Sequence, residues 1–143
     1  MRIDKSNATI INSESIYIHD DELILLQFDR NTNILTLFLK QSWPNEFEYT
    51  IEFIKVIGFE ITSCDFWGKS ECVLDFEFIE PDKQSIIPKL SEKWLSVEKD
   101  NRNDSLIENK FETIITFSSG DTLIISCEYI QFNKAHLSEV GQV

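Results

Sequence analysis

The sequence predicts a mainly β, β-rich α+β fold: an antiparallel meander of about six strands with one helix packed on it near residues 87–98. Residues that favour pleated, half-buried surfaces are abundant, since isoleucine supplies 20 of the 143 residues and phenylalanine 11. Alanine, the strongest helix former, occurs only twice. Apolar residues alternate along most of the chain, but they recur at intervals of three and four between residues 87 and 97.

The length predicts one domain, residues 1–143, because 143 residues can enclose a hydrophobic core without disulfides or metals. No repeat or low-complexity segment divides the chain. Residues 6–11 fit either a short helix or an edge strand. We expect residues 1–15 and 133–143 to be peripheral or frayed, as chain ends often are.

The first predicted hairpin joins an apolar run at residues 23–28 to a second strand at residues 34–40. The uninterrupted apolar run is typical of a buried strand. Polar residues 29–33 tolerate the left-handed conformation, so they predict a loop of about five residues.

The next predicted strand is long, because apolar residues alternate from Phe47 as far as Phe53 and the pattern continues to residue 61. Gly58 predicts a bulge or bend where the strand would otherwise be too long. A further strand at residues 72–79 has one apolar face and one polar face. The apolar face holds Cys72, Leu74, Phe76 and Phe78, and the polar face holds Asp75 and Glu77.

The helix follows from an apolar stripe that consists of Ile87, Leu90, Trp94 and Val97. Pro88 then lies in the first turn, where its missing N–H group costs little.

The last predicted hairpin joins residues 111–117 to residues 122–132 through Ser118, Ser119 and Gly120. A three-residue loop needs a positive φ at its third position, which glycine adopts without steric cost. This register places Phe111 opposite Cys127, and Glu112 opposite Ser126.

The net charge of −12 argues against a general affinity for nucleic acid, because phosphate binding depends on Lys and Arg. No apolar run approaches the roughly 20 residues that span a bilayer, and no signal-peptide pattern is present at the start. We therefore expect a cytoplasmic protein without membrane contact. The cysteines, Cys64, Cys72 and Cys127, are expected to be reduced.

His19 and Asp20 could form an acid/base pair or half of a metal site, or they could be a turn that leads into a strand. Cys64 has no nearby histidine to activate it. Phosphate-binding glycine loops and the Gly-x-Ser-x-Gly motif are absent. The sequence thus predicts no catalytic residues, no metal site and no cofactor, and we expect a protein that is not an enzyme.

A partner-binding surface is predicted around an aromatic residue in a polar loop. Trp67 lies between Asp65 and Glu71, which is the composition of an interface anchor surrounded by charge. Asp75 and Glu77 extend the acidic surface. The alternatives are that Trp67 folds over an open end of the sheet, and that the carboxylates are simply solvated.

The chain also resembles a class of small bacterial domains with a His-Asp dipeptide, which includes immunity proteins of polymorphic-toxin systems. The resemblance is carried by residues 16–79 and 111–132. Its residues are His19-Asp20-x-Glu22-Leu23, Phe28-Asp29, Asn33-x-Leu35-x-Leu37-x-Leu39, Phe53-x-x-Val56 and Phe117-x-x-Gly120-Asp121-x-Leu123-x-Ile125-x-Cys127.

This resemblance implies a non-enzymatic cytoplasmic protein that binds and neutralises a toxin, and it implies no catalytic residues. The acidic charge makes a basic toxin domain the candidate partner. A protein-interaction domain or a homo-oligomer that uses an exposed strand edge is the second hypothesis. A small enzyme with a site assembled from scattered residues is the third.

Overall fold

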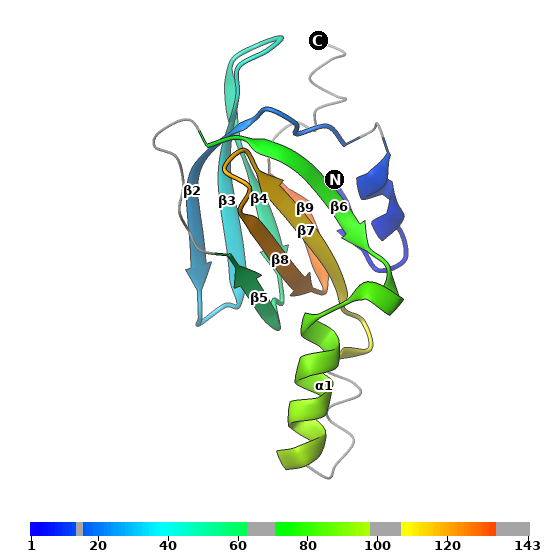
Figure 1. Cartoon of the computed structure of the whole chain (residues 1–143). Helices are drawn as coiled ribbons and strands as arrows, with labels where there is room; N and C mark the ends of the chain where they lie inside the picture. The colour runs from blue at the N-terminus through cyan, green and yellow to red at the C-terminus, as the bar shows by residue number, and fades with distance from the viewer. Residues whose placement is uncertain (14–15, 63–70, 98–106, 134–143) are drawn as a thin grey trace.

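The computed structural model describes residues 1–13, 16–62, 71–97 and 107–133, which form two antiparallel sheets, one α-helix and two short 3-10 helices (Figure 1). The five-stranded sheet has the order β1-β9-β4-β3-β2, and the four-stranded sheet has the order β5-β8-β7-β6. The strands are β1 (Arg2–Asp4), β2 (Glu22–Asp29), β3 (Ile34–Gln41), β4 (Phe47–Ile54), β5 (Gly58–Ile61), β6 (Val73–Ile79), β7 (Phe111–Phe117), β8 (Thr122–Cys127) and β9 (Tyr129–Phe132). The helices are η1 (Ala8–Asn12), η2 (Pro81–Lys83) and α1 (Ile86–Val97).

The predicted mainly β fold with one helix is confirmed, and α1 is within one residue of its expected position. The strands, however, form two sheets rather than one meander, because two long runs bend from one sheet into the other. The first bend lies at Lys55, directly after β4, where φ is 56°. The prediction had placed this bend at Gly58. The second separates β8 from β9 at Glu128, whose N–H group donates to the Ile54 carbonyl at 3.1 Å.

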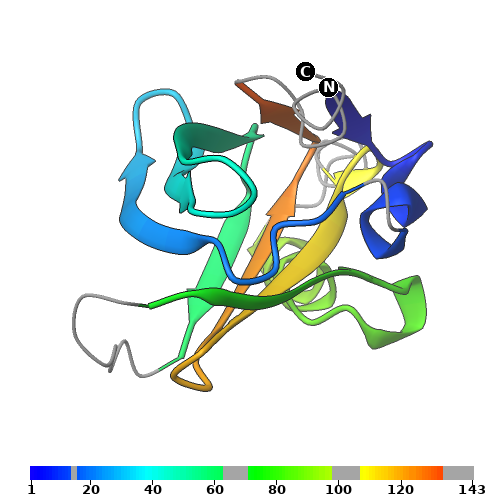
Figure 2. The same ribbon diagram turned by 90° about the horizontal axis from the view of Figure 1, so that it is seen from above.

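The hydrophobic core lies between the two sheets and is built by strand alternation. Leu35, Leu37 and Leu39 of β3 are at most 1% exposed, and Ile51 and Phe53 of β4 are fully buried. The facing sheet contributes the buried side chains Phe76, Phe111, Ile115, Leu123, Ile125 and Cys127. In Figure 1 α1 extends below the strands, so that Figure 2 shows it end-on.

The expectation of a peripheral N-terminus is wrong for the described residues 1–13. Ile3 of β1 pairs with Ile130 of β9 and is 0% exposed, and Ile11 of η1 is also buried. The segment is short and irregular, but its buried apolar side chains, Ile3, Ala8 and Ile11, belong to the core.

The first hairpin is confirmed, but β2 is an edge strand and not a buried one. A β-bulge between Leu23 and Leu25 changes the alternation, and as a result Ile24 is 52% exposed and Leu25 is 49% exposed. The apolar run therefore supplies both core and surface residues.

A second bulge changes the faces of β6. It lies between Val73 and Asp75, so Val73 is buried while Leu74 is 42% exposed. Leu74 was expected on the apolar face with Phe76. The extra residue turns it outward beside Asp75.

The β7–β8 hairpin has the predicted register, with Phe111 opposite Cys127 and Glu112 opposite Ser126. Gly120 has the expected positive φ, at 92°.

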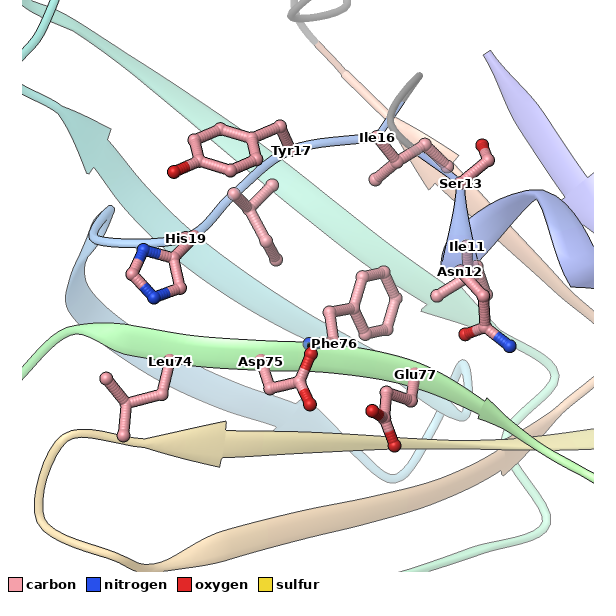
Figure 3. A pocket seen from close by; sticks show the side chains of 11 residues that line it. Ile11, Asn12, Ser13, Ile16, Tyr17, His19, Leu74, Asp75, Phe76 and Glu77 are labelled. Carbon is pink, nitrogen blue, oxygen red and sulfur yellow. Dashed lines mark hydrogen bonds between the residues drawn. The ribbon is translucent and has the colours of Figure 1, made fainter.

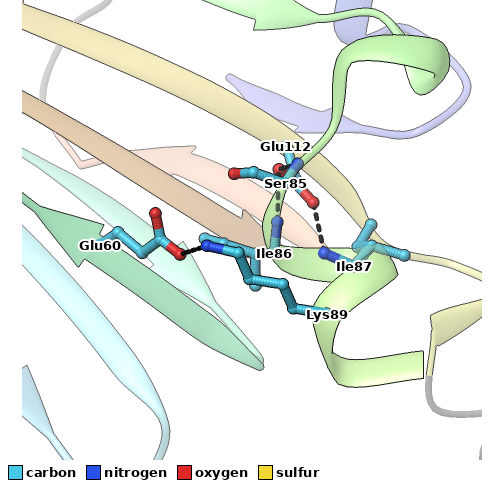
Figure 4. A network of polar contacts seen from close by, with 6 residues as sticks. All are labelled: Glu60, Ser85, Ile86, Ile87, Lys89 and Glu112. Atoms are coloured by element: carbon cyan, nitrogen blue, oxygen red, sulfur yellow. Dashed lines mark hydrogen bonds and ion pairs between the residues drawn. The ribbon is translucent and has the colours of Figure 1, made fainter. Parts of the chain in front are cut away.

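Strand β7 also fixes the start of α1, although it follows the helix in the sequence. The buried Glu112 carboxylate accepts hydrogen bonds from the backbone N–H groups of Ser85 (3.0 Å), Ile86 (3.2 Å) and Ile87 (2.6 Å) (Figure 4). These groups have no partner within the helix, so the carboxylate acts as its N-terminal cap. A Cβ atom on Gly58 would lie 2.8 Å from Ile86 Cγ2. Gly58 therefore permits the close approach of α1 to β5.

The described residues contain no helix that is long and apolar enough to cross a membrane.

Candidate functional site

An open groove of about 490 Å³ lies beside β6, the edge strand of the four-stranded sheet (Figure 3). One wall is β6 itself, and the other is formed by the end of η1 and the segment of residues 16–19. The polar and exposed residues that line it are Asn12, Ser13, Tyr17, His19, Leu74, Asp75 and Glu77.

The two walls are joined at both ends of the groove. At one end the Phe78 N–H group donates to the Asn12 side-chain carbonyl at 2.9 Å. At the other end Asp20 N–H donates to the Val73 carbonyl at 2.7 Å, and Val73 N–H donates to the Asp21 carbonyl at 2.9 Å. Between these two sets of hydrogen bonds the groove is open, so its width is set by the bonds that the β6 backbone makes to the Asn12 side chain and to the backbone of Asp20 and Asp21.

Asp75 and Glu77 are two residues apart on β6, and both side chains are exposed to solvent. Figure 3 shows them directed to the side of the strand opposite to Phe76. A hydrogen bond with Asp75, together with repulsion between the two charges, raises the pKa of Glu77. A cation placed between the carboxylates would remove this repulsion, so the pair is suited to binding a positively charged group.

The exposed side chains of His19 and Asp20 lie in contact at the rim of the groove, with His19 Nδ1 3.0 Å from Asp20 Oδ2. The Tyr17 ring lies beside the imidazole, with ring centroids 5.9 Å apart. Asp20 has a φ of 71°, which is typical of a turn residue, and its N–H group donates the hydrogen bond to the Val73 carbonyl of β6. Within the described ranges, no three His, Cys, Asp or Glu side chains come together as a metal site would require.

Asp21 is a buried carboxylate that the sequence did not single out. It is 5% exposed, and its Oδ2 accepts a hydrogen bond from the hydroxyl of Tyr49. Burial raises the pKa of Asp21 to about 6, and burial beside this carboxylate also raises the pKa of Tyr49. The sequence shows a run of three carboxylates at residues 20–22, but nothing in that run indicates that Asp21 is the buried one.

The predicted binding residues divide into three groups. Asp65 and Trp67 lie outside the described residues. Asp75 and Glu77 lie together in the groove. Glu71 is elsewhere: it is 4% exposed, and its carboxylate accepts hydrogen bonds from Ser118 Oγ and Ser119 N, both at 2.8 Å. Glu71 thus holds the β7–β8 turn, and its charge does not face solvent.

The described thiols are poorly suited to nucleophilic chemistry. Cys127 is fully buried, which raises its pKa, and burial together with nearby carboxylates raises the pKa of Cys72. Cys127 is a free cysteine. Cys64 lies outside the described residues.

No protein-family model matches this sequence, and no curated protein matches it. A crystal structure of an uncharacterized protein from Neisseria gonorrhoeae is similar, at 17% identity and a TM-score of 0.45. The similarity covers 94% of this chain and 98% of that chain. At this level of similarity no residue role is transferred between the two proteins.

Proposed function

We propose that this protein is a non-enzymatic, cytoplasmic binding protein of the immunity type, which neutralises a basic toxin domain by stoichiometric binding. The observation that carries the proposal is the exposed pair Asp75 and Glu77 in an open groove. None of the ion pairs among the described residues involves either carboxylate. The pair is therefore available to Lys or Arg side chains of a partner.

The surroundings of the pair resemble a protein interface more than a simple solvated surface. Tyr17 is 62% exposed and Leu74 is 42% exposed, and both line the same groove. A partner would bury these two side chains and surround them with charged contacts. Trp67 and Asp65 stay candidate contacts from the sequence alone.

The overall charge supports a basic partner. A net charge of −12 attracts cationic proteins over several ångströms and raises their association rate. Domains that attack nucleic acids carry basic surfaces that bind phosphates. The carboxylates of the groove would occupy such a surface in place of the phosphates.

The test compares two double variants that change the net charge equally. D75K/E77K reverses the groove, whereas E92K/E108K reverses two exposed carboxylates on α1 and before β7. Partners captured by the wild-type protein from its native host are identified by mass spectrometry, purified and titrated by calorimetry. We expect one basic partner that binds at a ratio of one to one. D75K/E77K should weaken binding at least tenfold, and E92K/E108K should weaken it less than threefold.

An acidic partner, or equal weakening by both double variants, would show that the groove is not the binding surface. Conversion of the partner by catalytic amounts of this protein would contradict the stoichiometric mechanism. The pH dependence gives a further check, because a cation bound between the carboxylates lowers the pKa of Glu77. Binding should therefore release protons near the raised pKa.

A further inference from the structure

Backbone hydrogen bonds at one end of the groove join the turn before β2 to the start of β6. Asp20 N–H donates to the Val73 carbonyl at 2.7 Å, and Val73 N–H donates to the Asp21 carbonyl at 2.9 Å. A third bond, from Leu23 N–H to the Glu71 carbonyl at 2.8 Å, continues this pairing. Because β2 and β6 are edge strands of different sheets, these bonds also join the two sheets on this side of the protein.

The side chain of Asp21 is buried at this junction. It is 5% exposed, and within the described ranges the Tyr49 hydroxyl of β4 is the hydrogen-bond donor to its carboxylate. A buried carboxylate is costly to ionise unless a positive charge compensates it. Burial therefore raises the pKa of Asp21 to about 6 against the lowering effect of the Tyr49 hydrogen bond, and the charge of Asp20 raises it further.

No described cation offsets the charge that Asp21 gains when it ionises. None of the ion pairs among the described residues involves its carboxylate. The amine of Lys40 is bound to Glu46 at 3.0 Å, and the imidazole of His19 contacts Asp20. The titratable and charged groups around the junction are Tyr49 of β4, Lys40 of β3, His19, Asp20 and Glu22 of the same turn, and Glu71 and Cys72 before β6.

We propose that Asp21 is a pH-dependent switch at this end of the groove: its protonated side chain keeps the turn bonded to β6, and its ionisation releases the turn and widens the groove. The ionised carboxylate is drawn toward water, and the carbonyl group of the same residue then leaves Val73 N–H. The closed form binds the proton more tightly than the open form, so the junction is closed in acid and opens as the pH rises. Only the consequence for binding rests on the proposed function, because the groove that widens is the one proposed to hold the partner.

The test is amide hydrogen exchange of the full chain at pH 5 and pH 7.5, measured by nuclear magnetic resonance and corrected for the intrinsic exchange rates. We expect the protection of the Asp20 and Val73 amides to fall about tenfold at the higher pH, since the pKa of the carboxyl is about 6 in the closed form and about 4 in the open form. The Phe78 amide, which donates to Asn12 at the other end of the groove, is the internal reference. Its protection should change less than about threefold.

Three variants identify the titrating group. Asp21→Asn should hold the protection of the Val73 amide at its pH 5 level at both pH values. Asp20→Asn, the matched control next in sequence, should keep the fall of about tenfold. Tyr49→Phe removes the hydrogen bond that lowers the pKa of Asp21, so the pH at which protection is lost should move upward.

Two results would overturn the switch. A loss of protection at Phe78 as large as that at Val73 would show that the whole protein, and not this junction, responds to pH. A pH response that persists in Asp21→Asn, or a midpoint that Tyr49→Phe leaves unmoved, would show that another group titrates. The exchange is measured without a partner, so either result leaves the proposed function standing, whereas capture of an acidic partner would overturn the proposed function and leave the switch in place.

Discussion

The carboxylate of Asp21, just before β2, and the hydroxyl of Tyr49 in β4 meet inside the protein, on either side of β3. The same aspartate accepts a hydrogen bond from Val73 N–H through its backbone carbonyl. One residue therefore links the interior of the five-stranded sheet to the first residue of β6. An isolated bridge between Glu22 and Cys72 continues this junction between the sheets.

Asp21→Asn is expected to stabilise the protein at neutral pH. The folded pKa of about 6 is above the unfolded value of about 4, so the folded state binds the proton more tightly. The stabilisation that protonated Asp21 provides is complete below pH 4 and is lost as the pH rises through 6. Asparagine can still accept the Tyr49 hydrogen bond without a buried charge. Urea denaturation should show a gain of about 1–3 kcal/mol at pH 7 and almost none at pH 4.

Asp20→Asn is the matched control, because it removes a neighbouring charge that is exposed and because asparagine also accepts a positive φ. Its effect on the pH dependence should be small. A gain for Asp21→Asn that is the same at pH 4 and pH 7 would contradict the assignment of the titrating group.

Glu112→Gln should destabilise the protein strongly. The carboxylate accepts three backbone hydrogen bonds at the start of α1, and the amide nitrogen of glutamine can accept none of them. We expect a loss of about 2–4 kcal/mol in the free energy of unfolding. Glu60→Gln serves as the control, since Glu60 forms only an exposed ion pair with Lys89 of the same helix (2.7 Å). It should cost less than about 1 kcal/mol. Equal effects of the two substitutions would contradict the capping role.

Gly120→Val should lower stability by about 1 kcal/mol or more, because a β-branched residue strains at a φ of 92°. A Cβ atom at this position would meet nothing within 4 Å, so the cost is one of backbone conformation and not of packing. Gly120→Asn should cost less, since asparagine tolerates positive φ. Thermal unfolding of both variants measures the difference. A valine variant as stable as the wild type would show that the turn is wrongly assigned.

The thiols should differ in reactivity. In protein prepared without air and without added reductant, three thiols should titrate after denaturation, because none of the cysteines is expected in a disulfide. In the folded protein Cys127 should react at least a hundredfold more slowly than a free thiol, owing to its burial and raised pKa. Fast modification of Cys127, followed by mass spectrometry, would indicate that the β8 region opens readily.

Sequence patterns predicted the elements whose structure depends on residues close together in the chain, namely the β7–β8 hairpin and α1. The loop at Gly120 fixed the register of β7 and β8, and the apolar stripe placed α1 within one residue. The passage of the chain from one sheet to the other was not predicted. Lys55 interrupts the alternation that begins at Phe47, but this interruption does not show that the strand changes its pairing partner. The β-bulges in β2 and β6 were also not predicted, because the sequence pattern does not show where an extra residue interrupts the strand pairing. One extra residue turned Leu74 outward, and another left Leu25 on the surface.

Of the two walls of the groove, the sequence analysis placed only the side chains of the β6 wall on one strand face. Asp75 and Glu77 follow from the strand pattern, but the opposite wall comes from residues more than fifty positions earlier. Its attachment through Asn12 and Asp20 depends on side-chain and turn contacts that no periodicity reveals. Glu71 failed as a predicted surface residue for the same reason, since its Ser118 and Ser119 partners are distant in sequence.

The cap that Glu112 places on α1 also constrains the order of events during synthesis. The helix leaves the ribosome first, and the carboxylate that accepts its Ile87 N–H group follows 25 residues later. Until then the first turn has only water as a partner, and an isolated helix of 12 residues is marginal in water. The nascent helix can therefore become stable only when β7 has emerged, which couples its formation to completion of the four-stranded sheet.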